Sequence, residues 1–250
     1  MDWACELLGT ALLILGGLSA VVLDFGSGSP VARAVPSHSL RLLITGTLFA
    51  SCGALVTISP LGRRSGAHLN PAVTLAFWCH GHVRLQDLFG YALSQAAGAV
   101  AGAFAVHALW GTRATSVEDG LTHPGHGFGP LAAAGLEAVM TALLVLTIFA
   151  FVSSRKTMHW TPLAVAAVVA LLVWQGAPYT GTSLNPARSL GPAVVSGRFT
   201  DYWVYVAGPL SGALLAAGIW VLVPLETLTA KLFHDKRYRS VFASALPAKR

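Results

Sequence analysis

The chain alternates long apolar runs with short polar loops. Six runs are predicted to cross a membrane, since about 20 apolar residues in a helix span a hydrocarbon core of about 30 Å. Two further apolar runs are only about half as long, and each follows the same triplet, Asn-Pro-Ala. Five of the six long runs cover approximately residues 3–25, 39–59, 85–110, 161–175 and 202–224. The remaining run, the fourth along the chain, starts near residue 130 and ends before the basic turn at Arg155.

The two short runs begin with a signal for the start of a helix. Asn is a preferred N-cap residue and Pro is favoured at the first helical position. The runs end about ten residues later, which gives helices of roughly 15 Å, about half the thickness of the membrane core. One triplet alone would start an ordinary surface helix, but two copies, each preceded by Gly-x-x-Leu, favour a repeated half-helix. The triplets are Asn70, Pro71 and Ala72 in the first half and Asn185, Pro186 and Ala187 in the second.

The same order of elements occurs twice, in repeats at about residues 1–110 and 130–224. Each repeat has a span that carries a glutamate, a second span, a half-helix and a third span. Because three spans are an odd number, the two repeats must lie in opposite orientations across the membrane. The pattern predicts an all-α membrane protein with six transmembrane helices and two re-entrant half-helices in an inverted repeat. Residues 1–224 form this domain and residues 225–250 a basic tail.

Composition and charge agree with this fold. Apolar residues make up 54% of the 250 positions and charged residues 10%. The net charge of +6 does not indicate nucleic-acid binding, because the basic residues are scattered over loops and the tail, where they mark membrane topology. With both termini in the cytoplasm, eleven of the 16 basic residues lie inside, and we expect the protein in the plasma (cell inner) membrane. The eleven are Arg63, Arg64, Arg84, Arg155, Lys156, Lys231, Lys236, Arg237, Arg239, Lys249 and Arg250.

Glu6 and Glu137 need an explanation, since a carboxylate within a span costs about 2.5–3.5 kcal/mol on insertion scales. One interpretation places them near helix ends, where they reach water. The interpretation that we favour is structural: the irregular segments before the half-helices leave backbone N–H groups that lipid cannot satisfy, and a buried carboxylate can accept from them.

Taken together, the motifs resemble those of the aquaporin (major intrinsic protein) family. Ser-Gly-Ala-His-Leu-Asn-Pro-Ala-Val-Thr at 65–74, Leu-Asn-Pro-Ala-Arg-Ser at 184–189 and the Glu and Thr pairs at positions 6 and 10 and positions 137 and 141 carry the resemblance. It extends from Glu6 to Pro224. It implies a scaffold role for the two glutamates and a homotetramer in which each protomer holds its own pore.

The resemblance also implies a selectivity filter. Arg188 matches the family's pore arginine, and counting back from Asn185 assigns Val173 and Thr182 to the same constriction. The second-span member is Thr45 in our first assignment, with Phe49 and Ala50 as alternatives. The family position of His68 implies a pore-lining residue on the inner side, although a lone His in an apolar stretch is more often a structural residue. Strict water channels carry His where this chain has Val173.

These features predict a passive channel, not an enzyme. Two half-helix N-termini that meet at the membrane centre would repel cations, and the asparagine amides would donate to passing molecules. We expect water and small uncharged solutes, such as glycerol-like polyols, urea or metalloid hydroxides, to pass, and ions and protons to be excluded. The alternatives are a strict water channel and an alternating-access transporter. No cofactor, metal site or nucleic-acid partner is expected; the partners are the solutes and the lipid bilayer.

Overall fold

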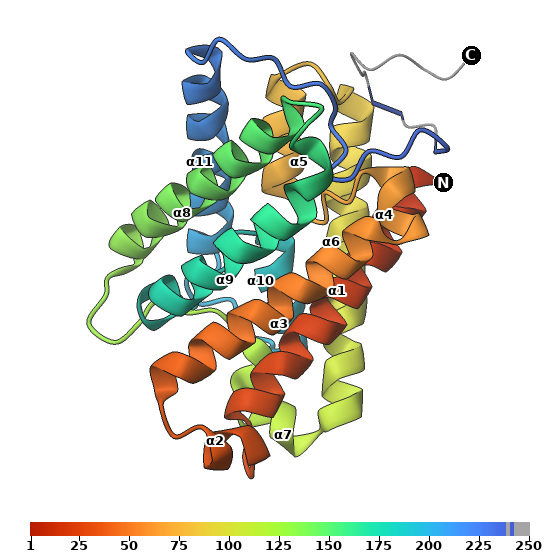
Figure 1. The fold of residues 1–250 in the computed structure, drawn as a ribbon. Helices are drawn as coiled ribbons and strands as arrows, with labels where there is room; N and C mark the ends of the chain where they lie inside the picture. The colour runs from red at the N-terminus through yellow and green to blue at the C-terminus, as the bar shows by residue number, and fades with distance from the viewer. Residues whose placement is uncertain (239–240, 243–250) are drawn as a thin grey trace.

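The predicted fold is confirmed by six helices of membrane-spanning length among the residues that the structure describes (Figure 1). The computed structural model describes residues 1–238, 241 and 242. Two half-helices lie between the spans, end to end, with α5 above α10 in Figure 1. The spans are α1 (Asp2–Phe25), α3 (His38–Ile58), α6 (Leu85–Trp110), α8 (Pro130–Val152), α9 (Thr161–Thr180) and α11 (Val204–Val221), and the half-helices are α5 (Pro71–Cys79) and α10 (Pro186–Ser196).

Five short helical segments connect these elements, and one span is longer than predicted. Helix α9 continues past Gln175 to Thr180, although Pro178 lies inside it. A proline removes one helical hydrogen bond, and membrane helices tolerate this where neighbouring elements satisfy the freed groups. The short segments are α2 (Pro30–Ala34), α4 (Pro60–Ser65), α7 (Thr112–Thr115), η1 (Glu118–Gly120) and η2 (Met158–Trp160).

The first and third spans of each repeat approach closely through small residues. A Cβ atom on Gly98 of α6 would lie 2.2 Å from the carbonyl oxygen of Leu7 in α1. A Cβ atom on Gly212 of α11 would lie 2.2 Å from the carbonyl oxygen of Ala138 in α8. Small residues allow this backbone approach, which increases the van der Waals packing between helices in lipid. The two repeats therefore use the same packing device.

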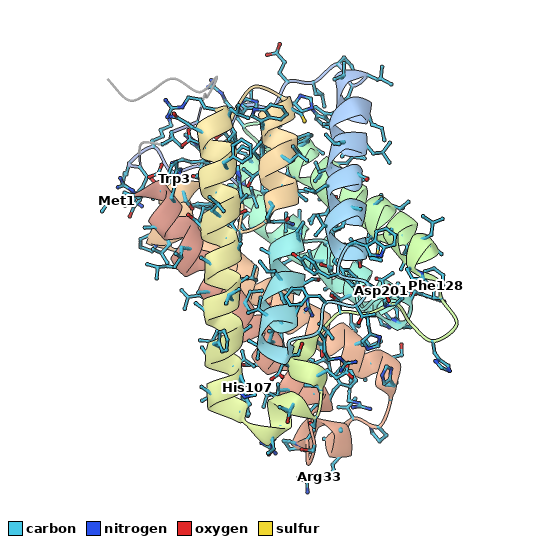
Figure 2. All side chains as sticks on the ribbon, turned by 180° about the vertical axis from the view of Figure 1, so that it is seen from behind. Met1, Trp3, Arg33, His107, Phe128 and Asp201 are labelled. Atoms are coloured by element: carbon cyan, nitrogen blue, oxygen red, sulfur yellow. The ribbon has the colours of Figure 1, made fainter. Side chains whose placement is uncertain are left out.

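The ends of the molecule can be told apart by their residues. Met1 lies at one end, whereas Arg33 and His107 lie at the other (Figure 2). The tail residue Asp235 lies at the same end as Met1, where it forms an ion pair of 3.1 Å with Arg63. We call this end, with Met1 and residues 225–238, the terminal end, and the other the opposite end.

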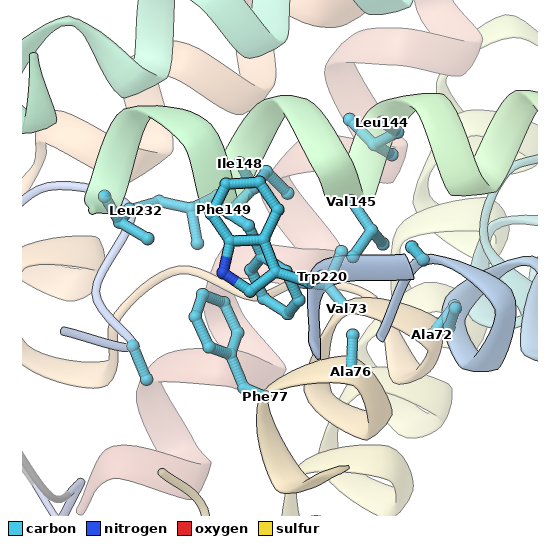
Figure 3. Packing of buried hydrophobic residues seen from close by; sticks show 14 of the residues in the cluster. Ala72, Val73, Ala76, Phe77, Leu144, Val145, Ile148, Phe149, Trp220 and Leu232 are labelled. Carbon is cyan, nitrogen blue, oxygen red and sulfur yellow. The ribbon is translucent and has the colours of Figure 1, made fainter. Parts of the chain in front are cut away.

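An aromatic cluster fixes α5 at the terminal end. The Phe77 ring centroid is 5.2 Å from that of Phe149, which is 5.6 Å from that of Trp220. Figure 3 shows these rings together with Leu232 from the tail. The short helix α5 is thus held by α8, by α11 and by the segment that follows α11.

Candidate functional site

The two half-helices begin with matching caps at the centre of the molecule. Asn70 Oδ1 accepts a hydrogen bond from the Ala72 N–H at 2.8 Å. Asn185 Oδ1 accepts from the N–H groups of Ala187 at 3.0 Å and Arg188 at 3.3 Å. Each asparagine thereby satisfies N–H groups at the start of its own helix, which would otherwise have no partner.

The same two asparagines also join the half-helices to each other. Asn70 Nδ2 donates to the Leu184 carbonyl at 2.8 Å, and Asn185 Nδ2 donates to the Leu69 carbonyl at 2.8 Å. An amide group has two N–H bonds. One N–H of each asparagine is therefore used in this joint, and the second is available to a molecule in the adjacent cavity, which both residues line.

The segments before the half-helices contain residues in the left-handed region. Ala67 and Leu69 have φ of 55° and 51°, and Thr182 and Leu184 have φ of 47° and 58°. The four residues occupy the third and first positions before each asparagine. Such residues cost about 1–3 kcal/mol each and persist only where surrounding contacts hold them.

Glu6 holds the first of these segments. Its Oε1 accepts from the His68 N–H at 3.1 Å and from the Ser65 hydroxyl at 2.7 Å. Its Oε2 accepts from the Leu69 N–H at 2.7 Å and from Gln95 Nε2 at 2.8 Å. The carboxylate is fully buried and does not reach water.

Glu137 holds the second segment in the same way. It accepts from the N–H groups of Ser183 and Leu184, both at 2.8 Å, and from the Thr180 hydroxyl at 2.7 Å. In both repeats the two N–H groups belong to the residues one and two positions before the asparagine. Glu137 is also fully buried, so the reading that these carboxylates reach water does not fit their positions.

Two tyrosines complete the repeat, and no role was predicted for either of them from the sequence. The Tyr91 hydroxyl donates to the Ser65 carbonyl at 2.7 Å, and the Tyr205 hydroxyl donates to the Thr180 carbonyl at 2.9 Å. Each tyrosine lies on the third span of its repeat and follows the asparagine by about 20 positions. A comparison of the two third spans by this spacing would have found them.

Two cavities meet at a junction formed by residues that line both. The cavity towards the opposite end has a volume of about 260 Å³, and the cavity towards the terminal end about 110 Å³. Either is larger than the roughly 10–15 Å³ that one water molecule requires. The residues that line both cavities, and so form the junction, are Phe49, Val169, Ser183, Leu184 and Arg188.

Arg188 is a fixed cation at this junction. Its Nη1 donates to the Gly120 carbonyl at 2.7 Å, and its Cζ lies 5.5 Å from the centre of the Phe49 ring. The residue is only 8% exposed. A charge beside an apolar wall acts more strongly on ions than the same charge in bulk water.

The structure places Phe49, not Thr45, against Arg188. Thr45 lines only the larger cavity, and its hydroxyl donates to the Asp24 carboxylate. The assignment of Thr45 depended on the segment 59–64, whose length made the count back from Asn70 uncertain. In this segment, α4 folds back on the end of α3, and Gly62 lies so close to the Val56 carbonyl that a Cβ atom would be 2.4 Å from it. The other alternative, Ala50, lines only the smaller cavity.

Val173 and Thr182 line the larger cavity, as Arg188 does. Val173 presents an apolar side chain there. The Thr182 hydroxyl donates to the Leu172 carbonyl at 3.3 Å, so its proton is engaged within the protein. Towards a solute, Thr182 thus offers its oxygen as an acceptor, and Arg188 supplies the donors.

His68 lines the smaller cavity, with both ring nitrogens engaged. Its Nε2 donates to the Ala230 carbonyl at 2.8 Å, and because a carbonyl can only accept, Nε2 carries the proton. Its Nδ1 lies 3.1 Å from the Thr74 hydroxyl. The ring is stacked between Phe77 and Phe242, at centroid distances of 5.0 Å each. The imidazole therefore serves packing as well as the cavity wall.

The described residues hold no group of three or more His, Cys, Asp or Glu side chains that could bind a metal ion. Cys5, Cys52 and Cys79 are free thiols.

Comparisons with known proteins agree with this geometry. A family model described as "Major intrinsic protein" matches residues 2–220. Aquaporin NIP1-3 from Oryza sativa subsp. japonica is 34% identical over 246 residues, which is 93% of this chain and 79% of that protein. Aquaporin-2 from Homo sapiens is 38% identical over 237 residues, 91% of this chain and 81% of that protein. The X-ray structure of the aquaglyceroporin from Plasmodium falciparum has a TM-score of 0.74 at 22% identity, covering 89% of this chain and 96% of that one. The chain therefore belongs to the major intrinsic protein family, whose members are membrane channels and not enzymes.

Proposed function

We propose that this protein is a passive channel for water and for small uncharged solutes, and that it excludes ions and protons. The observation that carries the proposal is the pair of cavities that meet at Arg188, beside the joined tips of the two half-helices. A molecule that moves between them passes mainly apolar walls that carry a few polar groups, among them Arg188, Asn70 and Asn185. This is the lining expected of a route for small neutral molecules.

Electrostatics supports the exclusion of ions. Each half-helix N-terminus carries a partial positive charge of about half an elementary charge, and the two are aimed at each other. The Arg188 guanidinium adds a full charge at the junction. The free N–H bonds of Asn70 and Asn185 would orient a passing water so that no continuous proton wire crosses the centre, as is general for aquaporin-type pores.

The filter supports permeation by solutes larger than water. We assign Phe49, Val173, Thr182 and Arg188 to it, with Phe49 in the second-span position. A valine is smaller than a histidine and gives the carbon backbone of a solute an apolar surface. Arg188 and Thr182 supply a donor and an acceptor for its hydroxyl groups. A strict water channel, which is the alternative, would need a junction that a solute of glycerol's size cannot pass.

An alternating-access transporter is the weaker candidate. Such carriers commonly bind a coupling ion or a charged substrate through carboxylates at the membrane centre. In this chain the two carboxylates at the half-helix segments, Glu6 and Glu137, are already occupied by backbone N–H groups. They are therefore poor ligands for an ion.

The proposal is tested with purified protein in proteoliposomes. Stopped-flow light scattering measures vesicle shrinkage in a sucrose gradient and reswelling in glycerol, urea and boric acid. We expect water permeability above that of empty liposomes, and permeability to at least one of the three solutes. Water permeability with all three solutes excluded would leave a strict water channel, and no water permeability in any form of the protein would contradict the proposal.

For the assembly, we propose a homotetramer in the plasma membrane with the terminal end in the cytoplasm. Charge supports the orientation, because most basic loop and tail residues belong to this end. The tetramer rests on membership of the family alone. The mass of the detergent-solubilised protein, measured by light scattering and corrected for detergent, should equal four chains.

Cysteine labelling tests the orientation. In a Cys79→Ser background, Ser116→Cys introduces a thiol at an exposed site of the opposite end. A membrane-impermeant maleimide should modify it in intact cells. The matched control, Lys236→Cys at the exposed surface of the terminal end, should react only after the cells are opened. The reverse pattern would show that the orientation is inverted.

A further inference from the structure

The segment after the last span folds back onto the protein. Figure 1 shows residues 225–238 running from the end of α11 past α5 towards the N-terminus. The segment contains no helix or strand, yet Thr229, Ala230 and Lys231 are at most 3% exposed. Irregular segments normally run over the surface. This one is inserted into the terminal end of the molecule.

Backbone hydrogen bonds connect the segment to both repeats. The Leu228 N–H donates to the Val152 carbonyl at the end of α8, at 3.1 Å. The Leu232 N–H donates to the Gly66 carbonyl at 3.0 Å, within the turn that precedes the first half-helix. Between them, the Ala230 carbonyl accepts from His68. The segment is therefore attached directly to the groups that form the inner part of the site.

A buried lysine holds the segment in place. Lys231 Nζ donates to the carbonyls of Arg63 and Tyr238, both at 2.8 Å. Burial lowers the pKa of Lys231. An ammonium group removed from water is costly unless its donors are satisfied, so these two carbonyls are needed for the segment to stay inserted. Asp235 adds an ion pair to Arg63 at 3.1 Å, on the surface.

The segment lies where the route should open at the terminal end. Leu232 lines the smaller cavity together with Asn70 and Asn185. Figure 3 shows Leu232 beside Phe149 in the same cluster as Phe77. The smaller cavity has less than half the volume of the larger one. Through Leu232, residues 226–238 thus form part of the wall at this mouth.

We propose that residues 226–238 are an autoinhibitory plug, which closes the terminal-end mouth when inserted and opens it when released. This inference rests on the proposed channel function. The segment has no helix or strand, so its release breaks the hydrogen bonds at Gly66, His68, Val152 and Arg63 and the apolar packing of Ala230 and Leu232, but no regular element. Release would expose the cavity wall at Leu232 while the half-helices keep their own caps and carboxylate contacts.

The test compares the full chain with a form that ends at Pro224. If the mouth is open in about a tenth of the full-length molecules, removal of the plug should raise water permeability per protein about tenfold. Lys231→Ala, which removes both Nζ hydrogen bonds, should give an intermediate increase. The matched control, Lys236→Ala, changes an exposed residue of the same segment and should leave permeability unchanged. Circular dichroism and thermal unfolding establish that each variant is folded.

The outcomes separate this inference from the proposed function. If a folded Lys231→Ala protein and the truncated form conduct water no faster than the full chain, the segment is a fixed wall and the plug does not exist. If both the full chain and the truncated form are folded but conduct no water, the channel function fails and the plug with it. An increase that Lys236→Ala reproduces would also contradict the plug, because that residue does not hold the segment.

Discussion

Replacing Glu137 by alanine is expected to destabilise the folded protein by about 2–6 kcal/mol, because two buried N–H groups lose their acceptor at about 1–3 kcal/mol each. The two groups are those of Ser183 and Leu184, and the left-handed Leu184 and Thr182 depend on the same contact. Thermal unfolding in detergent and the yield of folded protein measure the effect. Glu6→Ala should lower the stability and the yield of folded protein in the same way.

The chain offers a matched control one helical turn away. Thr141 is as fully buried as Glu137, but its hydroxyl has no hydrogen-bond partner among the described residues. Thr141→Val should therefore leave stability unchanged or raise it, since it removes an unsatisfied polar group. A Glu137→Ala protein with normal yield and stability but altered solute preference would contradict the scaffold role and assign Glu137 to the pore wall.

The largest effect on selectivity is expected at Val173. Val173→His places a larger, polar ring on the wall of the larger cavity, which Arg188 also lines. Glycerol permeability should fall about tenfold or more, since a few extra atoms in a fitted site are worth about 1–3 kcal/mol. Water permeability should remain, because water is small enough to pass and can bond to the imidazole. Both rates are measured in the same proteoliposomes by stopped flow.

A second variant separates size from polarity. Val173→Leu enlarges the side chain without adding a polar atom, so it should reduce glycerol permeability less than Val173→His does. Leu171→Phe, on the exposed surface of the same helix, should change neither rate. If Val173→His leaves the ratio of glycerol to water permeability unchanged, Val173 does not belong to the filter.

Local chemistry explains why most of the fold could be predicted from the sequence. The Asn-Pro pairs fix the starts of α5 and α10 through a side-chain cap and a preset φ angle, and neither depends on distant residues. The apolar runs fix the six spans because the membrane core demands a minimum length. The inverted orientation followed from the odd number of spans per repeat. The family resemblance is confirmed by the family model and by the relatives.

Long-range packing explains what the sequence did not predict. The predicted fifth span ends at Gln175, whereas α9 continues to Thr180 with Pro178 inside it. The first assignment of Thr45 depended on the path of the chain between α3 and Asn70, which the contact of Gly62 with the end of α3 determines. The sequence gives no signal that residues 226–238 are inserted. A lysine in a basic tail is expected to be exposed to water, whereas Lys231 is buried.

The flux of glycerol as a function of its concentration tests the central claim most directly, because it distinguishes a passive pore from a carrier. The measurement uses proteoliposomes of the form that ends at Pro224, so that the plug does not limit the rate, with empty liposomes as the baseline. A continuous route between the two cavities predicts a flux proportional to the glycerol gradient, together with rapid water flow. A flux that saturates at low glycerol concentration, with water permeability no higher than that of empty liposomes, would contradict the passive channel.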